Sequence, residues 1–459
     1  MAESNQLATG RSMRKVAATA LAGTSIEWYD FFIYGTAAAL IFPTAFFPSD
    51  MPVMVSLIAA FSTFAIGFVA RPIGGVVFGH FGDRVGRKSA LVTALMMMGI
   101  ATTLIGCLPT YALIGPAAPL LLTLLRFTQG FAVGGQWGGA MLLVTENAPR
   151  NMRGFYGAFA QAGAPVGLIL ANVAFLVVDG FLTEEQFMDW GWRIPFLLSV
   201  ALIGLSLYVQ LHLEDTPAFR EMQKVRDRRN NEESLAGANI AQSSSPVLEV
   251  IRSHPRQILL AAGAFLAVQV TFYILIAFVV AYGTNPSGLG LPREMLLSAV
   301  LISSLVQIPV LFLASAYSDL HGRRGVYMLG AILGGCWAFA LFPLIDTGEF
   351  LWIAVALCGG QICIGLMYGP QAAFLAEMFS THVRYSGASL GYQLGAILGG
   401  AFAPIVATAL WAGFGTFYIS IYIALASALT LISVMLLTET HGTDLDDAGV
   451  RVRSPSTDP

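Results

Sequence analysis

The chain has 459 residues, of which 56% are hydrophobic and 11% are charged, and its mean hydropathy is +0.71. A soluble globular protein carries roughly twice this charged fraction, so the composition excludes a soluble fold and indicates a membrane protein. The formal net charge of −3, with basic residues spread over loops rather than gathered in one patch, argues against nucleic acid as a partner.

Twelve apolar runs follow one another along the chain, each long enough to cross the hydrocarbon core of a bilayer as a helix of about 20 residues. The predicted spans are 17–42, 52–79, 89–108, 117–145, 155–178, 191–211, 258–283, 294–317, 326–345, 351–376, 386–411 and 416–437. The basic N-terminal segment has no small-residue cleavage site after a short apolar core, which favours a retained first span over a signal peptide. The predicted fold class is therefore an all-α integral membrane protein.

The basic residues predict the orientation of these spans, because cytoplasmic segments are enriched in Lys and Arg. Twelve spans place both termini on one side of the membrane. All but four of the 24 basic residues fall in the tails, the central loop and the alternate short loops of that side. Arg193 and Arg293 lie on the opposite side, and Arg71 and Arg126 lie within spans. We expect a multi-pass protein of the inner (plasma) membrane with both termini in the cytoplasm.

A long polar loop divides the spans into two halves. The expected organisation is an N-terminal tail over 1–16, a six-helix bundle over 17–211, a cytoplasmic linker over 212–257, a second six-helix bundle over 258–437 and a C-terminal tail over 438–459. The linker is polar and rich in Ser, Asn and Gln, and the tail shows no apolar periodicity.

Corresponding loops of the two halves carry the same motif. The loop after the second span reads GHFGDRVGRKS, in which Asp83 precedes Arg87 and Lys88. The loop after the eighth span reads SAYSDLHGRRG, in which Asp319 precedes Arg323 at the same spacing as Asp83 and Arg87. The repeat indicates two related bundles.

A second pair of motifs supports the same repeat. ENAPRNMRG follows the fourth span directly and EMFSTHVRYSG follows the tenth. Each sets a Glu seven residues before an Arg, namely Glu146 before Arg153 and Glu377 before Arg384. Two related halves are one of the plans of secondary transporters, whose substrate site lies between the halves near the middle of the membrane.

The first span contains two acids within the apolar run GTSIEWYDFFIYGTAAALIF. An ionised acid at the centre of a lone spanning helix costs at least about 2.5 kcal/mol, so such residues usually face a cavity or a partner. Glu27, Asp30 and Tyr34 are spaced i, i+3 and i+7, which predicts one shared helix face. Arg71 and Arg126 are expected near the same depth, and we expect the acids and arginines to meet in a shared aqueous cavity.

At these motifs the chain resembles the major facilitator superfamily. GHFGDRVGRK is similar to its cytoplasmic signature, and RFTQGFAVGG, from Arg126 to Gly135, is similar to its fourth-helix motif. GTSIEWYDFFIYG, ARPIGGVVFGHFGDRVGRK and LEDTPAF resemble the metabolite:proton symporter branch, which carries shikimate, 2-oxoglutarate, citrate, proline and betaine. The resemblance implies twelve helices in two pseudo-symmetric bundles that expose a central site by alternating access.

The expected function is proton-coupled import of a small organic acid, either shikimate-like or a di- or tricarboxylate. Glu27 and Asp30, one or both, are the candidates for the coupling proton, because a carboxylate moved between paired and isolated settings can take up or release one. Arg126 or Arg71 is expected to hold the substrate carboxylate, since guanidinium stays charged and presents a planar fork. For Arg71, a static ion pair that only fixes helix packing is nearly as good an interpretation.

Further polar side chains are expected to complete the substrate site, although amides and phenols in spans often only join helices. They are Tyr34, Gln129, Gln161, Gln269, Tyr273, Gln361, Tyr368 and Tyr392, with Asn172, Ser303, Gln307, Gln371 and Gln393 beside them. The charges of this pocket would come from the first half alone, which suits a small anion or zwitterion with hydroxyl groups.

The loop motifs are expected to form a cytoplasmic gate, as the resemblance implies for Asp83, Arg87 and Lys88. The same role is assigned to Glu146, Arg153, Asp319, Arg323, Glu377 and Arg384. Plain membrane topology accounts for the basic members, but an acid adds nothing to that rule.

Three other functions are compared with organic-acid import. A zwitterion symporter for betaine or proline fits the same charges. A drug/proton antiporter of this fold carries Gly directly before Pro in its fifth helix, whereas QAGAPVGLI has Ala164 between Gly163 and Pro165. A membrane enzyme is not expected, because no nucleophile–base, metal-ligand or phosphate-loop motif is present. We expect no cofactor or metal, and partners limited to substrate, protons and lipid around a monomer.

Overall fold

The computed structural model describes residues 10–85, 87–134, 141, 144–145, 148–212, 252–379 and 384–441. Within these ranges the chain is helical, with no strand. Residues 213–251 of the predicted linker and 442–459 of the predicted tail lie outside the description.

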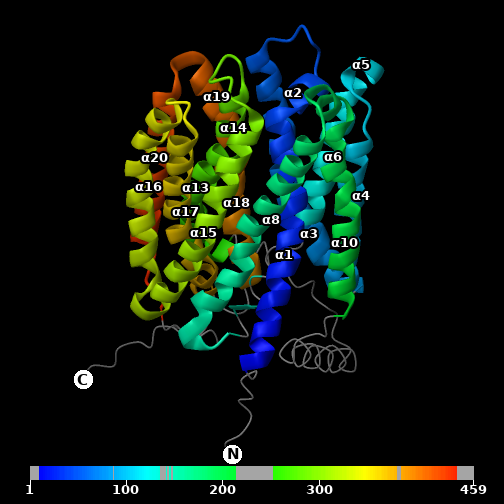
Figure 1. The fold of residues 1–459 in the computed structure, drawn as a ribbon. Helices are drawn as coiled ribbons and strands as arrows, with labels where there is room; N and C mark the ends of the chain where they lie inside the picture. The colour runs from blue at the N-terminus through cyan, green and yellow to red at the C-terminus, as the bar shows by residue number, and fades with distance from the viewer. Residues whose placement is uncertain are drawn as a thin grey trace, which may run out of the picture.

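Six long helices make the N-terminal half (Figure 1). They are α1 (Gly10–Leu40), α3 (Val53–Val85), α4 (Arg87–Cys107), α6 (Ala117–Val133), α8 (Arg153–Phe181) and α10 (Arg193–His212). Short segments connect them: α2 (Phe42–Ala45), α5 (Tyr111–Ile114), η1 (Arg150–Met152), α9 (Glu184–Gln186) and the π-helical turn η2 (Phe187–Gly191). Helix α1 begins before the predicted first span, at Gly10, and helix α3 continues past the predicted second span to Val85.

Six more helical spans make the C-terminal half, and two of them contain a π-helical segment. These spans are α13 (Pro255–Tyr273) with η3 (Ile274–Phe278) and α14 (Val279–Thr284), α15 (Arg293–His321), α16 (Arg323–Ile345), α17 (Phe350–Met378), α18 (Arg384–Gly395) with η4 (Ala396–Ala401) and α19 (Ala403–Phe414), and α20 (Thr416–Leu436). Figure 1 shows the two bundles side by side, with the start of α1 and the end of α20 at the same end, here called the terminal end.

The outer surface shows that these helices are built for lipid. Eight described helical segments are long and apolar enough to span a membrane, with two shorter apolar helices, Val92–Cys107 and Ala117–Val133, in the positions of the third and fourth spans. On α20, Leu425, Leu429 and Ile432 recur at helical spacing and are each more than half exposed. Such apolar stripes would be a liability in water and are ordinary against acyl chains. The protein is therefore a multi-pass integral membrane protein.

The connections between spans are tight where glycine permits them. Gly322 has φ +100° and serves both as the last cap of α15 and as the first cap of α16. Gly415 has φ +95° and separates α19 from α20 in the same way. L-residues rarely adopt such angles, so these one-residue turns depend on glycine.

Backbone contact between α3 and α6 fixes the helices that carry the two arginines. A Cβ built on Gly130 would lie 2.0 Å from the carbonyl oxygen of Gly67, and one on Gly134 would lie 1.9 Å from the carbonyl oxygen of Arg71. Small residues of this kind let membrane helices approach closely. On the other side of the cavity, Gly391, Gly395 and Gly399 pack on α13.

Replacement of Gly130 tests this helix crossing. Gly130→Ala should lower the thermal unfolding temperature of the purified protein by several degrees, because the added methyl group forces α3 and α6 apart and displaces Arg126. Fluorescence-monitored unfolding measures this shift. Gly204→Ala on α10 is the control, since nothing lies within 4 Å of its Cβ position and alanine favours a helix over glycine by about 1 kcal/mol. Equal unfolding temperatures for both variants would contradict the assignment.

Candidate functional site

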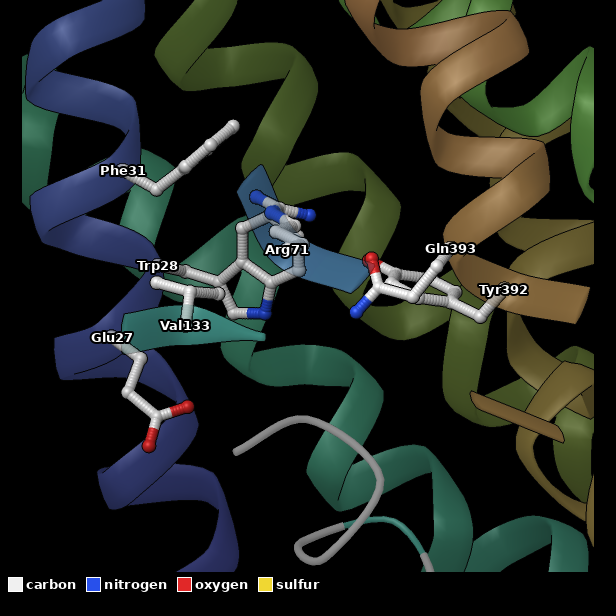
Figure 2. Close-up of a pocket in the computed structure, with 7 residues that line it drawn as sticks. All are labelled: Glu27, Trp28, Phe31, Arg71, Val133, Tyr392 and Gln393. Atoms are coloured by element: carbon white, nitrogen blue, oxygen red, sulfur yellow. The ribbon is translucent and has the colours of Figure 1, made fainter. Parts of the chain in front are cut away.

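A pocket with one acid and one base lies between the two bundles. Its space of about 330 Å³ includes a part open to solvent, and it is lined by Glu27, Trp28, Phe31, Arg71, Val133, Tyr392 and Gln393. Figure 2 shows the α1 residues on one side, Tyr392 and Gln393 of α18 on the other, and Arg71 of α3 between them. We call it the charged pocket.

A second pocket of about 280 Å³ adjoins the first and shares Trp28 and Tyr392 with it. It is lined by Trp28, Ala164, Val268, Gln269, Phe272, Tyr273, Gln307, Ile364, Tyr368 and Tyr392. No acidic or basic side chain is among these residues, and most of them come from the C-terminal half. We call it the neutral pocket.

Arg71 is held by aromatic rings rather than by an acid. Its guanidinium carbon lies 4.4 Å from the ring centre of Phe31, 4.5 Å from that of Phe68 and 5.8 Å from that of Trp28. The side chain is only 2% exposed, and its Nε and Nη2 atoms have no hydrogen-bond acceptor among the described residues. Cation–π contacts stabilise the charge without using the Nε and Nη2 donors, which leaves these two donors for a ligand.

Arg126 occupies a similar aromatic setting deeper in the N-terminal bundle. Its guanidinium carbon lies 4.3 Å from the ring centre of Phe31 and 4.2 Å from that of Tyr34. Its Nη1 donates to the Gln129 amide oxygen, and the Gln129 amide nitrogen donates to Thr102 and to the main-chain oxygen of Asp30. Arg126 lines neither pocket.

The three polar residues predicted on one face of α1 take different environments. Glu27 is partly exposed and lines the charged pocket, where Figure 2 shows its carboxyl group directed away from Arg71. Asp30 is fully buried, and neither carboxyl oxygen has a hydrogen-bond partner among the described residues. The Tyr34 hydroxyl donates to Thr63 of α3 at 2.7 Å.

The expected pairing of acids with arginines is absent. Among the described ion pairs, none joins Glu27 or Asp30 to Arg71 or Arg126. The Phe31 ring takes the place of an acid, since both guanidinium groups lie within 4.5 Å of its centre. Sequence reasoning missed Trp28 and Phe31 as site residues. The only signal for them is that they flank the two acids in the first span.

Other predicted site residues divide between the pockets and the helix interfaces. Gln269, Tyr273, Tyr368 and Tyr392 line the neutral pocket. Gln161 donates across the halves to the main-chain oxygen of Tyr368 at 3.3 Å. Gln361 is fully buried and lines neither pocket, and both of its amide atoms lack partners among the described residues.

At the terminal end, Asp319 connects the halves. Its carboxylate accepts hydrogen bonds from the backbone N–H groups of Gly154 and Phe155, each at 2.8 Å, at the N-terminus of α8. A helix N-terminus is a favourable site for an anion. Arg323 joins this carboxylate at 2.5 Å and Glu377 at 3.2 Å, and all three side chains are buried.

The segment after α20 completes this cluster. Glu439 accepts from the backbone N–H groups of Arg323 and Arg324 at 2.9 and 3.0 Å, and Thr440 donates to Glu377 at 2.9 Å. Burial opposes ionisation of Glu439, but backbone N–H donors, first those of Arg323 and Arg324, lower its pKa below the usual value. The carboxylate therefore stabilises the folded protein near neutral pH, and this contribution declines as the pH falls through the lowered pKa.

Several predicted gate residues cannot be compared with the structure. The side chains of Asp83, Arg87, Lys88 and Arg384, and the whole of Glu146, lie outside the described residues. Arg153 is described and is buried at the start of α8.

A second contact between the halves lies at the end opposite the termini. Arg293, the first residue of α15, donates to Asp179 at 2.8 Å and to both carboxyl oxygens of Glu184, and its guanidinium carbon lies 3.8 Å from the ring centre of Phe187. Sequence reasoning did not select Arg293 as functional. Its position as one of two basic residues on the sparsely charged side was the available signal. The helices α8 and α15 are thus joined at both ends.

Comparison with known proteins places the chain in a family. A family model described as "Sugar (and other) transporter" matches residues 15–450. The inner membrane metabolite transport protein YhjE of Escherichia coli (strain K12) is 43% identical over 94% of this chain and 95% of its own length. The shikimate transporter of the same strain is 39% identical over 93% and 95%. A proline/betaine transporter of Salmonella typhimurium (strain LT2) is 31% identical over 95% and 85%.

Solved structures show the same fold. The proton:xylose symporter XylE of the major facilitator superfamily superposes with a TM-score of 0.73 at 16% identity, covering 95% of this chain and 98% of its own. A partially occluded inward-open form of XylE from E. coli gives 0.71. The two six-helix bundles, together with these structures, confirm the predicted fold class. The matching family model and the relatives are described as transporters and not as enzymes, in line with the expectation from the sequence. The chain belongs to the sugar (and other) transporter family and has the fold of the major facilitator superfamily.

Proposed function

We propose that the protein is a proton-coupled symporter that imports a small organic acid by alternating access. One observation carries this proposal. Arg71 is a buried cation that lines a pocket between the halves, and its Nε and Nη2 donors have no partner among the described residues. These two N–H groups form one edge of the guanidinium plane and match the two oxygens of a carboxylate. The shikimate transporter among the relatives supports an organic acid as substrate.

The two acids of α1 supply candidate proton carriers. Asp30 is buried, and none of the ion pairs among the described residues includes it. In such a setting the ionised form is costly and a bound proton removes the cost. Glu27 lies at the charged pocket with Arg71, so a substrate carboxylate bound there would alter its electrostatic environment. Substrate binding at Arg71 and proton binding at Glu27 then influence each other electrostatically, because both residues line the charged pocket.

The contacts between α8 and α15 supply the gates. With Asp319 on the N-terminus of α8 and Arg293 on Asp179 and Glu184, contacts join the two halves on both sides of the cavity. Loss of one set of contacts while the other persists opens the cavity toward one side only. We propose that the terminal end is cytoplasmic, as the basic residues of the loops predict. The name of the relative YhjE supports the inner membrane as the location. We further propose that the protein works as a monomer.

A zwitterion is the second candidate substrate. Trp28, Phe272, Tyr273, Tyr368 and Tyr392 surround the neutral pocket, and aromatic rings bind quaternary ammonium groups. The proline/betaine transporter among the relatives supports the same alternative.

Neutralisation of the acids tests proton coupling. Glu27→Gln, and separately Asp30→Asn, should abolish uphill accumulation of shikimate in proteoliposomes with an imposed pH gradient, because the carrier loses its proton site. If Glu27 or Asp30 carries the coupling proton, the variant that lacks this carboxyl group should still exchange labelled for unlabelled substrate in the absence of a pH gradient. Glu185→Gln, an exposed carboxylate on α9, should behave as wild type. Uphill uptake by both single variants would contradict the role of these acids.

Removal of each gate contact tests alternating access. A cysteine placed at Ala164 on a background without Cys107, Cys336, Cys358 and Cys363 reports whether an impermeant thiol reagent reaches the neutral pocket. Asp319→Asn should raise labelling from the terminal side about tenfold, and Arg293→Gln should raise it from the opposite side by a similar factor, since about 1.4 kcal/mol of lost contact gives tenfold.

The comparison of the two gate variants is the internal control. Each should leave labelling from the other side unchanged or lower, because closing one end favours opening of the other. Increased labelling from both sides at once would indicate a loosened bundle instead of two separate gates.

A further inference from the structure

Four polar atoms of the cavity lining are buried and unpartnered among the described residues. Two are donors, Nε and Nη2 of Arg71, and two are amide oxygens, Oε1 of Gln393 in the charged pocket and Oε1 of Gln307 in the neutral pocket. The three side chains are at most 4% exposed. Buried polar atoms are ordinarily satisfied, so their pattern describes the groups that a bound substrate presents.

From this pattern we infer that the site selects an organic acid with a single carboxylate and at least two hydroxyl groups, one placed at Gln393 and one at Gln307. This inference rests on the proposed function and narrows its substrate. It also makes Gln307 and Gln393 the residues that determine specificity.

The number of carboxylates follows from the charges that line the cavity. Arg71 is the only basic side chain among the described residues lining either pocket. Arg126 is turned into the N-terminal bundle, where it contacts Tyr34 and Gln129. A second carboxylate would have to lie among neutral side chains or beside Glu27, where no cation offsets its loss of water. Di- and tricarboxylates are thereby disfavoured.

The hydroxyl groups follow from the two glutamines. A hydroxyl group donates to an amide oxygen and accepts from an amide nitrogen, so it satisfies a glutamine side chain in either orientation. A trimethylammonium group can do neither and would leave both oxygens buried without a partner. Leaving a buried polar group unpaired is a strong source of discrimination. The aromatic lining of the neutral pocket then serves as an apolar wall for the substrate ring, with Trp28 reaching both pockets.

Ligands built on one ring test this inference. The panel consists of 3,4,5-trihydroxycyclohexanecarboxylate, unsubstituted cyclohexanecarboxylate, cyclohexane-1,3-dicarboxylate and glycine betaine, and binding to the purified full-length protein is measured by calorimetry. We expect the trihydroxy acid to bind at least tenfold more tightly than each of the others. Gln307→Met and Gln393→Met should each reduce the preference for the trihydroxy acid over the unsubstituted acid at least fivefold.

A matched control separates recognition from packing. Gln371 is a buried glutamine of α17 that donates to the Tyr327 hydroxyl and lines neither pocket, so Gln371→Met should leave the preference unchanged. If Gln307→Met does not give folded protein, Gln307→Asn keeps the amide and withdraws it from the pocket by one methylene.

Three results would overturn the inference: equal or tighter binding of the dicarboxylate or betaine, an unchanged preference in both glutamine variants, or the same loss in Gln371→Met. Any of these leaves the proposed function intact provided that some member of the panel is still accumulated with protons. The proposed function fails separately if no organic acid is accumulated in response to a pH gradient.

Discussion

The arrangement of the site depends on one aromatic ring shared by two cations. The ring centre of Phe31 lies within 4.5 Å of the guanidinium carbons of both Arg71, at the pocket between the bundles, and Arg126, inside the N-terminal bundle, and no described ion pair joins either arginine to an acid. An ion pair would have consumed the donors of the arginines and the charge of the acids. Because the ring contact spares both, Arg71 keeps its Nε and Nη2 donors for an anion and the carboxyl groups of α1 keep their capacity to bind protons.

The same two helices carry the contacts at both ends of the cavity. Helix α8 presents its N-terminus to Asp319 of α15, and α15 presents Arg293 to Asp179 of α8. Since the helices run antiparallel, a tilt of one against the other lengthens the contacts at one end and preserves those at the other. The geometry thus favours exposure of the central site to one side at a time, which is what coupled transport requires.

The fold could be read from the sequence to a large extent, because apolar runs of membrane length and a repeated loop motif are strong, local signals. The pockets could be read only in part. Glu27, Arg71, Tyr273 and Tyr392 were identified because polar groups within spans are costly and therefore informative. Trp28 and Phe31 gave no such signal, since an aromatic residue in an apolar run is ordinary. Helical spacing also could not show that Asp30 is buried while Glu27 is partly exposed, because this difference depends on how α8, α10 and α3 pack around α1.

The position of Glu439 has a consequence for the order in which the chain acquires its structure. This carboxylate supplies the hydrogen-bond acceptors for the first two backbone N–H groups of α16, more than a hundred residues earlier in the sequence. While the protein is being synthesised, these two N–H groups lack this acceptor until the residues beyond α20 have been made. The contact of Glu439 with the start of the ninth span therefore forms late, and it links completion of the polypeptide to completion of the cluster formed by Asp319, Arg323 and Glu377.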